Sequence, residues 1–258
     1  MRVTILGSGT SHGVPMIGCH CEVCRSKNAK NNRTRPSILV EGPDGTILVD
    51  TTPELRLQSI AAGLNRVDAV LITHTHADHI FGMDDLRRFN DLCGHDIPVY
   101  GSESVLEDIR RIYRYVFIET QAGGGKPRLS LKPVAPSMVI CGLHIVCFTV
   151  LHGRLEVQAY RFTDPATGKS FAYVTDVSTI PESVMHNLHG LDLLILDAVR
   201  YEPHPTHFGL YQALEVISTV NPRTALLTHL SHHFDHDKLS SETPLHVDPA
   251  YDGQIITL

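Results

Sequence analysis

The segment His74-Thr75-His76-Ala77-Asp78-His79 decides the fold, because it places four metal-binding side chains within six residues. It follows a continuous apolar run, residues 67–73, that predicts a buried strand. In an extended or turning segment, residues two apart project to the same side, so His74 and His76 can reach one ion. If the chain then turns into a helix, Asp78 and His79 can face a second ion nearby. Imidazole nitrogen and carboxylate oxygen are ligands of ions such as Zn²⁺ and Mn²⁺.

Outward from this segment, apolar runs bounded by Gly and Pro predict further β-strands along the chain. They lie at residues 2–6, 37–41, 46–50, 143–149, 157–162, 170–175, 191–197, 224–228 and 253–257. Helices are predicted at 53–63, 181–188 and 210–220, and a capping box of Ser104 and Glu107 predicts another that runs to about residue 117. The glycine-rich segment 121–128 predicts a loop. Strands in two halves, each followed by helices, favour an α+β sandwich of two helix-covered sheets in one domain, residues 1–258.

Composition narrows the classes of protein to consider. The chain has 258 residues, 42% of them hydrophobic and 19% charged, which is ordinary for a globular protein. A formal net charge of -6 provides no overall basic field for sequence-independent nucleic-acid binding. We find neither a signal peptide nor an apolar run of the roughly 20 residues that span a bilayer. The sequence therefore predicts a cytoplasmic protein that uses neither a membrane nor nucleic acid as a partner.

A cluster of cysteines near the N-terminus predicts a second kind of metal site. Cys19, Cys21 and Cys24 are spaced so that three thiolates can surround one Zn²⁺ tetrahedrally. A structural zinc site is closed, so the fourth ligand should also come from the protein. Its candidates are the isolated cysteines Cys93, Cys141 and Cys147, or the histidine-rich stretch 228–235.

The pattern His-x-His-x-Asp-His after a buried strand resembles the metallo-β-lactamase superfamily. This resemblance implies an αββα sandwich with two divalent ions, Zn²⁺ or Mn²⁺, at one edge, and further ligands that each follow a later strand. Those positions are filled here by His152, Asp176 and His229. The resemblance implies one ion held by His74, His76 and His152, a second held by Asp78, His79 and His229, and Asp176 bridging the two.

The cysteine cluster is similar, within this superfamily, to that of the phosphoribosyl cyclic phosphodiesterase subgroup. This resemblance implies that His232 is the fourth ligand of the structural zinc. It also implies a catalytic histidine at the start of the helix that precedes the last ligand-bearing strand. His207 matches that place, and His204 is a second candidate for the general acid. Asp78 is counted as catalytic as well as a metal ligand.

These residues together predict a hydrolase in which a metal-bound hydroxide attacks a small, cyclic phosphodiester and His207 protonates the leaving oxygen. The alternatives are a tRNA 3′-processing-type endonuclease, a lactonase or thioesterase, and a non-catalytic metal-binding protein of pyrroloquinoline-quinone biosynthesis. The expected partner is a small-molecule phosphodiester, and a homodimer is left open. A weaker feature is the segment 7–13, Gly-Ser-Gly-Thr-Ser-His-Gly, which could bring backbone N–H groups to a phosphate; a tight turn explains it equally well.

Overall fold

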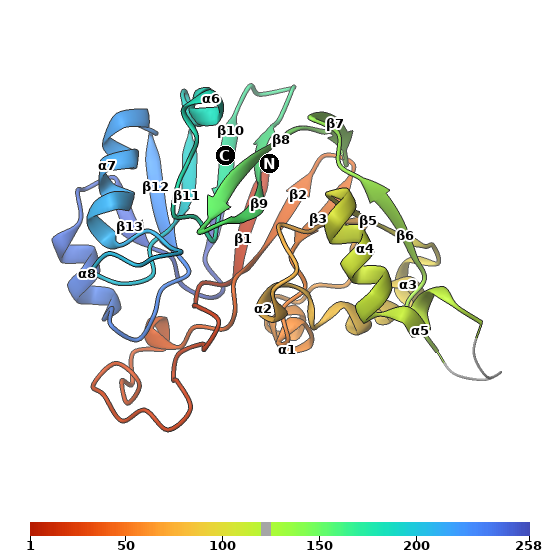
Figure 1. Cartoon of the computed structure of the whole chain (residues 1–258), viewed down its shortest axis with the longest axis horizontal. Helices are drawn as coiled ribbons and strands as arrows, with labels where there is room; N and C mark the ends of the chain where they lie inside the picture. The colour runs from red at the N-terminus through yellow and green to blue at the C-terminus, as the bar shows by residue number, and fades with distance from the viewer. Residues whose placement is uncertain (120–124) are drawn as a thin grey trace.

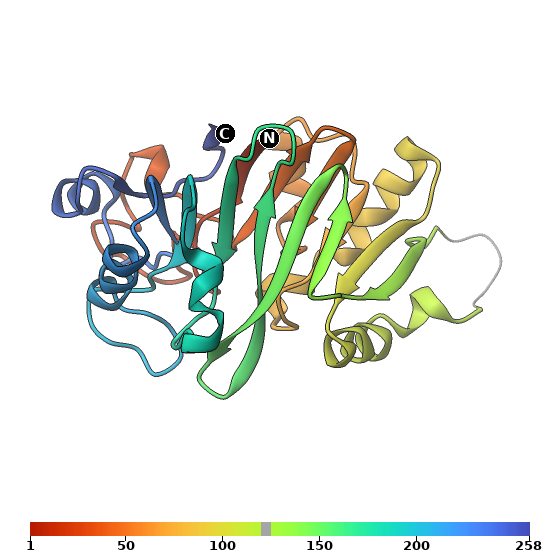
Figure 2. The same cartoon turned by 90° about the horizontal axis from the view of Figure 1, so that it is seen from above.

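Two seven-stranded sheets face each other in the computed structural model, which describes residues 1–119 and 125–258 (Figures 1 and 2). The first sheet has the strand order β14 (Ile255–Thr257), β1 (Arg2–Gly7), β2 (Ser37–Gly42), β3 (Gly45–Val49), β4 (Ala69–Leu71), β5 (Ile97–Gly101) and β6 (Leu129–Pro133). The second has the order β13 (Val247–Pro249), β12 (Thr224–Thr228), β11 (Leu193–Asp197), β10 (Ser170–Val174), β9 (Leu155–Thr163), β8 (Leu143–His152) and β7 (Ser137–Ile140).

Helices cover the outer faces of both sheets. The first sheet carries α1 (Leu55–Ala61), α2 (Ala77–Ile80), α3 (Leu86–Cys93), α4 (Glu103–Ile112) and α5 (Arg114–Phe117). The second carries α6 (Glu182–Met185), α7 (Leu210–Val220) and α8 (His236–Glu242), and α7 and α8 lie at the opposite end of Figure 1 from α3 to α5. Short 3₁₀ turns occur at Ala29–Asn31, Met83–Asp85 and His186–Leu188. The predicted αββα sandwich is therefore confirmed.

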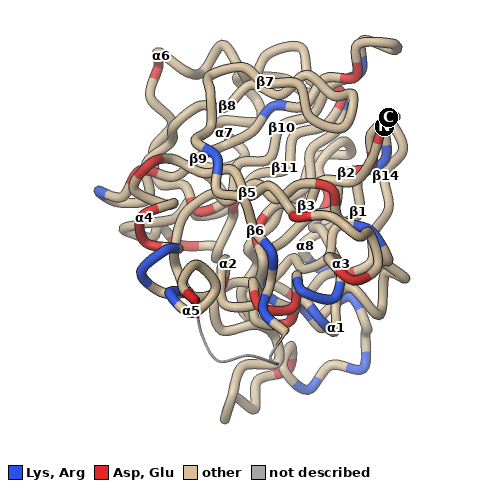
Figure 3. Tube along the Cα trace, turned by 90° about the vertical axis from the view of Figure 1, so that its right-hand side faces the viewer, with Lys and Arg blue, Asp and Glu red and all other residues tan. Residues whose placement is uncertain are grey.

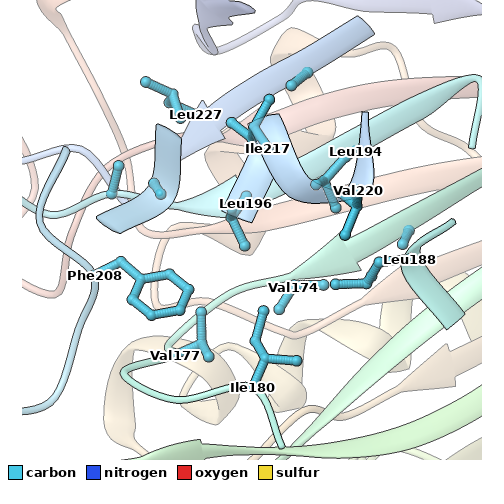
Figure 4. Close-up of a cluster of buried hydrophobic side chains, with 14 of the residues drawn as sticks. Val174, Val177, Ile180, Leu188, Leu194, Leu196, Phe208, Ile217, Val220 and Leu227 are labelled. Carbon is cyan, nitrogen blue, oxygen red and sulfur yellow. The ribbon is translucent and has the colours of Figure 1, made fainter. Parts of the chain in front are cut away.

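Three hydrophobic cores hold these layers together. The central core lies between the sheets, where Ile5 and Ile38 from one sheet belong to the same buried cluster as Phe162 from the other. A second core forms under the helices of the first sheet. The third packs α7 onto the second sheet, and Figure 4 shows Ile217 of α7 above Leu196 of β11. Each sheet buries both faces, which explains why its central strands read as continuous apolar runs.

The parallel strands of both sheets end at the edge where the functional residues lie. Strands β3 and β4 run parallel, as do β10, β11 and β12. Strand β8 runs in the same direction as β10, because two successive antiparallel pairings through β9 separate them. The carboxyl ends of these strands therefore meet at the same edge of each sheet, where loops can bring polar side chains together.

Several local predictions were wrong, and short or polar elements account for most of them. Helix α4 begins at Glu103 with Ser102 as its N-cap, whose side chain accepts from the Val105 N–H; the predicted Ser104 and Glu107 capping box does not form. The elements α8, β5, β6, β7 and β13 were not predicted. Part of the predicted loop at 121–128 lies outside the described residues. None of the described helices is long and apolar enough to cross a membrane.

Candidate metal centre and active site

The structure brings together, at the predicted edge, all the histidines and aspartates that the sequence singled out as metal ligands. The segment after β4 supplies four of them, and the others stand at the end of β8 or just after β10 and β12. Candidate ligand atoms of the predicted ligands lie within 4.8 Å of one another in three overlapping groups, and a fourth group includes His207. The three groups are His76, His152 and Asp176; His74, His79 and Asp176; and Asp78, His79 and His229.

Asp176 occupies the middle of this cluster. Its Oδ1 lies 3.1 Å from His79 Nε2 and 3.5 Å from His229 Nε2, while its Oδ2 lies 3.8 Å from His74 Nε2. Asp78 Oδ2 lies 3.4 Å from His79 Nε2 and 3.8 Å from His229 Nε2. The two oxygens of Asp176 thus face different histidines, the arrangement that a bridging carboxylate requires.

The backbone at three of these turns adopts a left-handed conformation. Asp50 and His229 directly follow a strand and Asp176 lies two residues after one, and their φ values are 64°, 59° and 50°. Such conformations are uncommon for residues other than glycine and cost on the order of 1–3 kcal/mol each. Their recurrence beside one cluster indicates that the position of the side chain is maintained at the expense of local backbone stability.

A second layer of hydrogen bonds fixes the outer nitrogens of the histidine rings. His79 Nδ1 lies 2.7 Å from the carboxylate of Asp50, which also accepts from the backbone and hydroxyl of Thr73, both at 2.8 Å. His152 Nδ1 lies 2.6 Å from the carbonyl oxygen of Thr206. His74 Nδ1 lies 3.1 Å from the Thr73 hydroxyl. These contacts leave Nε2 of each ring for the centre of the cluster and fix its orientation, as partners of metal-ligating histidines do.

The inner atoms of the cluster fit the ligand set of divalent cations. The Nε2 atoms of His74, His79 and His229 are buried without a hydrogen-bond partner among the described residues. An unpaired buried polar atom normally costs about 1–3 kcal/mol, so three in one cluster indicate that another group satisfies them. Neutral imidazoles and carboxylates form the donor set that Zn²⁺ and Mn²⁺ accept.

The electrostatics of the cluster also favour cations. Burial lowers the pKa of His79, but the carboxylates of Asp176, Asp50 and Asp78 outweigh it and hold that pKa well above its ordinary value. Burial likewise opposes a charge on His229, yet Asp176, Asp78 and Asp197 raise its pKa to about 9. The buried carboxylates therefore favour the binding of positive charge in this cluster, and divalent ions can provide it.

His207 lies against the metal cluster. Its ring centroid lies 4.4 Å from that of His152 and 4.6 Å from that of His229, and it groups with Asp176 and His229 as a potential ligand. His207 Nδ1 lies 2.8 Å from Oδ2 of the fully buried Asp197, which also accepts from the Val177 N–H at 2.9 Å. The ring of His204 lies one step farther out, 5.2 Å from that of His207.

The cysteine cluster forms a separate site with the predicted fourth member. Cys19, Cys21, Cys24 and His232 have their candidate ligand atoms within 4.8 Å of one another. His232 Nδ1 lies 3.2 Å from Cys19 Sγ and 3.5 Å from Cys21 Sγ. Cys24 Sγ accepts from the Met16 N–H, and Cys21 Sγ from the Cys24 N–H. Hydrogen bonding from the Cys24 backbone lowers the pKa of Cys21 to about 6, which favours the thiolate that zinc requires.

A buried arginine ties this N-terminal segment to the loop that carries His232. Arg33 is 1% exposed, and its Nη1 donates to the carbonyl oxygens of Ser231 at 3.1 Å and Phe234 at 2.9 Å. Its Nη2 donates to Asn31 Oδ1 at 3.1 Å. Burial lowers the pKa of Arg33 to about 10. The cysteine segment and the His232 loop, some two hundred residues apart in sequence, are therefore held together by more than the proposed zinc.

Sequence reasoning missed two carboxylates that orient the site. Asp50 directly follows β3, and its carboxylate contacts His79. Asp197 is the last residue of β11, and its carboxylate contacts His207. Both stand at the carboxyl end of a buried strand, as Asp176 does, and that shared placement was the available signal. The isolated cysteines Cys93, Cys141 and Cys147 take no part in the metal groups found among the described residues.

Comparison with known proteins gives a consistent result. The family model described as the β-lactamase superfamily domain matches residues 45–230. A solved structure described as a new diphosphatase from the PhnP family is 35% identical, with a TM-score of 0.90, and the match covers 99% of this chain and 97% of that one. Zn²⁺-bound PqqB from Methylobacterium extorquens shares the fold, with a TM-score of 0.83 at 19% identity and full coverage of both chains.

One curated relative is much longer than this chain. An octanoyltransferase of Porphyromonas gingivalis is 38% identical over 259 residues. The alignment covers 98% of this chain but 51% of that protein. The chain thus spans about half the length of this relative, and the activity in its name belongs to the whole of that protein.

Proposed function

Because the chain belongs to the metallo-β-lactamase superfamily and resembles its PhnP-type members, we propose that it is a dinuclear metal-dependent hydrolase of small phosphodiesters. The observation that carries the proposal is the combination of a complete ligand cluster with a histidine, His207, that lies against it and is held by a buried carboxylate. Metal ions bound in the cluster would activate water, and His207 would donate a proton to the leaving alkoxide.

The proposed ligand sets are those named from the sequence, with Asp176 between them. Divalent ions bound in these sets would activate water near neutral pH and stabilise negative charge on the phosphoryl oxygens. In the same proposal Asp78 is a ligand with His79 and His229, and its carboxylate orients the attacking water. A structural zinc ion is bound by Cys19, Cys21, Cys24 and His232.

His207 is the general acid in this proposal. Because Nδ1 is engaged by Asp197, Nε2 is the ring nitrogen left to donate a proton to a substrate. The Asp197 carboxylate fixes the orientation of the ring. As the bond from phosphorus to the leaving oxygen breaks, the proton passes from His207 Nε2 to that oxygen. His204 is farther from the cluster and is not in any of its ligand groups.

A small substrate suits this chain better than a folded RNA. The chain has 22 Lys and Arg residues against 28 Asp and Glu. Along the trace drawn in Figure 3, the positions of Lys and Arg are interspersed with those of Asp and Glu. Gripping an RNA takes several phosphate contacts from basic side chains, so a basic track would be expected.

The long relative supports a second candidate, which is acyl chemistry at the same centre. Its name, octanoyltransferase, makes a thioesterase or a related acyl hydrolase the alternative to test, because the same ions could polarise a carbonyl group. The name of the PhnP-family relative, a diphosphatase, favours phosphorus as the centre attacked.

A substrate comparison tests the proposal. The purified protein, loaded with Zn²⁺ or Mn²⁺, is assayed on a ribose cyclic phosphate, a nucleoside cyclic phosphate, a precursor tRNA and an octanoyl thioester, at about 50 and 200 mM salt. We expect turnover of a small cyclic ester with weak salt dependence. Cleavage of the precursor tRNA alone, falling by orders of magnitude at the higher salt, would identify a nuclease. Turnover of the thioester alone would identify an acyl hydrolase.

A further inference from the structure

Helix α4 contacts the ligand-bearing segment 75–80 from outside the metal cluster, at both ends of that segment. At its start, Thr75 Oγ1 donates to Asp108 Oδ2 at 3.0 Å. At its end, the Tyr113 hydroxyl donates to the backbone carbonyl oxygen of Ile80 at 2.7 Å. Asp108 lies in α4, and Tyr113 is the C-cap of that helix. One helix therefore braces the segment on both sides of the short helix α2.

The side chain of Thr75 points away from the cluster. The backbone of His76 is extended, with φ −62° and ψ 151°. Successive side chains of an extended segment project to opposite sides, so Thr75 faces away from the side that its two neighbours share. Those neighbours, His74 and His76, have ring centroids 4.5 Å apart. Thr75 thus connects the ligand segment to α4 without entering the cluster.

Asp108 offers Thr75 an acceptor whose position is fixed. Its other oxygen, Oδ1, accepts from Arg111 Nη2 at 2.7 Å, so each carboxylate oxygen has its own donor. The helix that carries Asp108 is anchored by Val105, Leu106 and Ile109, which are buried in the core of the first sheet. A hydrogen bond to a charged acceptor also contributes more than one between neutral groups.

His76 is the ligand of the segment that depends most on such support. It is exposed, whereas the other three ligands of the segment are buried. The outer ring nitrogens of His74 and His79 each have a hydrogen-bonding partner. Among the residues that the structure describes, the ring of His76 has none. The position of this ring is therefore set by the backbone on either side of it, and Thr75 is the residue before it.

We propose that Asp108 is a positioning residue for one of the two ions: through Thr75 it fixes the backbone that brings His76 to the ion shared with His74 and His152. This role rests on the ligand sets of the proposed function and extends them to a helix outside the cluster. The second ligand set contains no residue next to Thr75. The contact should therefore affect the affinity for one ion and leave the other unchanged.

Titration with Co²⁺ tests this role without a substrate. Protein that keeps its cysteine-bound zinc but has lost both other ions is titrated, and visible absorption with native mass spectrometry follows the two binding steps. His76→Ala identifies the step of the first ion, because it removes one of that ion's ligands. In Thr75→Val we expect the dissociation constant of this step to rise roughly 10-fold, the lower end of the range for partners of metal ligands, and the other to stay unchanged.

Matched variants separate the hydrogen bond from a general loss of stability. Thr75→Ser keeps the hydroxyl and should retain both wild-type constants. Glu107→Ala should retain them too, since it alters only the exposed neighbour of Asp108 on α4. Asp108→Ala should repeat the effect of Thr75→Val, and the double variant should bind no more weakly than either single one, because both side chains act through one contact.

Three results would overturn the proposal. Equal weakening of both steps in Thr75→Val would show only general structural support, and additive losses in the double variant would show that the two side chains act independently. Unchanged constants in Thr75→Val and Asp108→Ala would remove the positioning role and leave the phosphodiesterase intact. Failure of the proposed function itself looks different: the wild-type protein would then take up fewer than two Co²⁺ ions, which would contradict the ligand sets and this role with them.

Discussion

At the scale of single residues, three histidines at the centre each have one ring nitrogen held by a neighbouring residue. Asp50 engages Nδ1 of His79, Asp197 that of His207, and the Thr206 carbonyl that of His152. The ligand identities could be predicted from sequence because each histidine occupies a fixed place after a strand. Their partners were not predicted: Asp50 lies 29 residues before His79 and Asp197 lies 10 residues before His207, and no spacing motif links either pair.

His207→Ala tests the general acid at this scale. We expect the metal content to stay unchanged, because His207 is outside the two proposed ligand sets, and turnover of an alkyl phosphodiester to fall by roughly 10²–10⁴-fold. The loss should shrink for a nitrophenyl ester, whose leaving group needs little protonation. Steady-state kinetics with both esters measures the difference. An equal loss on both would make His207 a substrate-binding residue, and normal rates would transfer the role to His204.

His236 provides a pH-dependent prediction away from the catalytic cluster. Its side chain is buried against Tyr251, and burial, then Lys30 and Arg33, lowers its pKa to about 4. An unfolded histidine titrates near 6.5, so the unfolded chain binds more protons between pH 6.5 and 4, and stability falls as the pH falls through this window. His236→Phe keeps an aromatic ring and removes the titration. Between pH 7 and 5, urea unfolding should show the wild-type protein losing about 1–2 kcal/mol more than the variant. Parallel losses would contradict the account.

At the scale of elements, the success of sequence reasoning depended on length and apolar content. The ten-residue strand β8 and the fully buried strand β10 were predicted, whereas the three-residue strand β13 was not. Helix α8 was missed because only His236 and Leu239 of its seven residues are buried, so it lacks an apolar stripe; its N-cap Asp235 carries the local signal instead. The N-terminal zinc segment has no regular strand to predict between Gly7 and Ser37.

Cys24→Ser tests the proposed zinc and its effect on this segment. We expect the variant to lose one equivalent of zinc and several kcal/mol of stability, because binding of a structural zinc contributes directly to folding. Cys93→Ser is the matched control, since Cys93 lies outside the cluster. Metal analysis and thermal unfolding measure both effects. Full zinc content and unchanged stability in Cys24→Ser would show that the cysteines hold no structural metal.

At the scale of the whole molecule, the sandwich places residues from both sheets at one edge. The first sheet supplies the segment from His74 to His79, and the second supplies His152, Asp176 and His229. The fold and this convergence were implied by the resemblance of the His-x-His-x-Asp-His motif to the metallo-β-lactamase superfamily. Parallel strands that direct their carboxyl ends to a common edge explain the convergence. A cavity that His207 lines was not predicted, since three segments distant in sequence form its walls.

The most direct test of the central claim is metal titration combined with phosphodiesterase activity. Mild chelation should remove two ions and all turnover of a cyclic phosphodiester, leaving one zinc at the cysteine site, where three thiolates hold it more tightly. Adding back Zn²⁺ or Mn²⁺ should restore activity in proportion to two bound ions per chain, as counted by native mass spectrometry. Full activity in protein that retains only the cysteine-bound zinc would contradict the account.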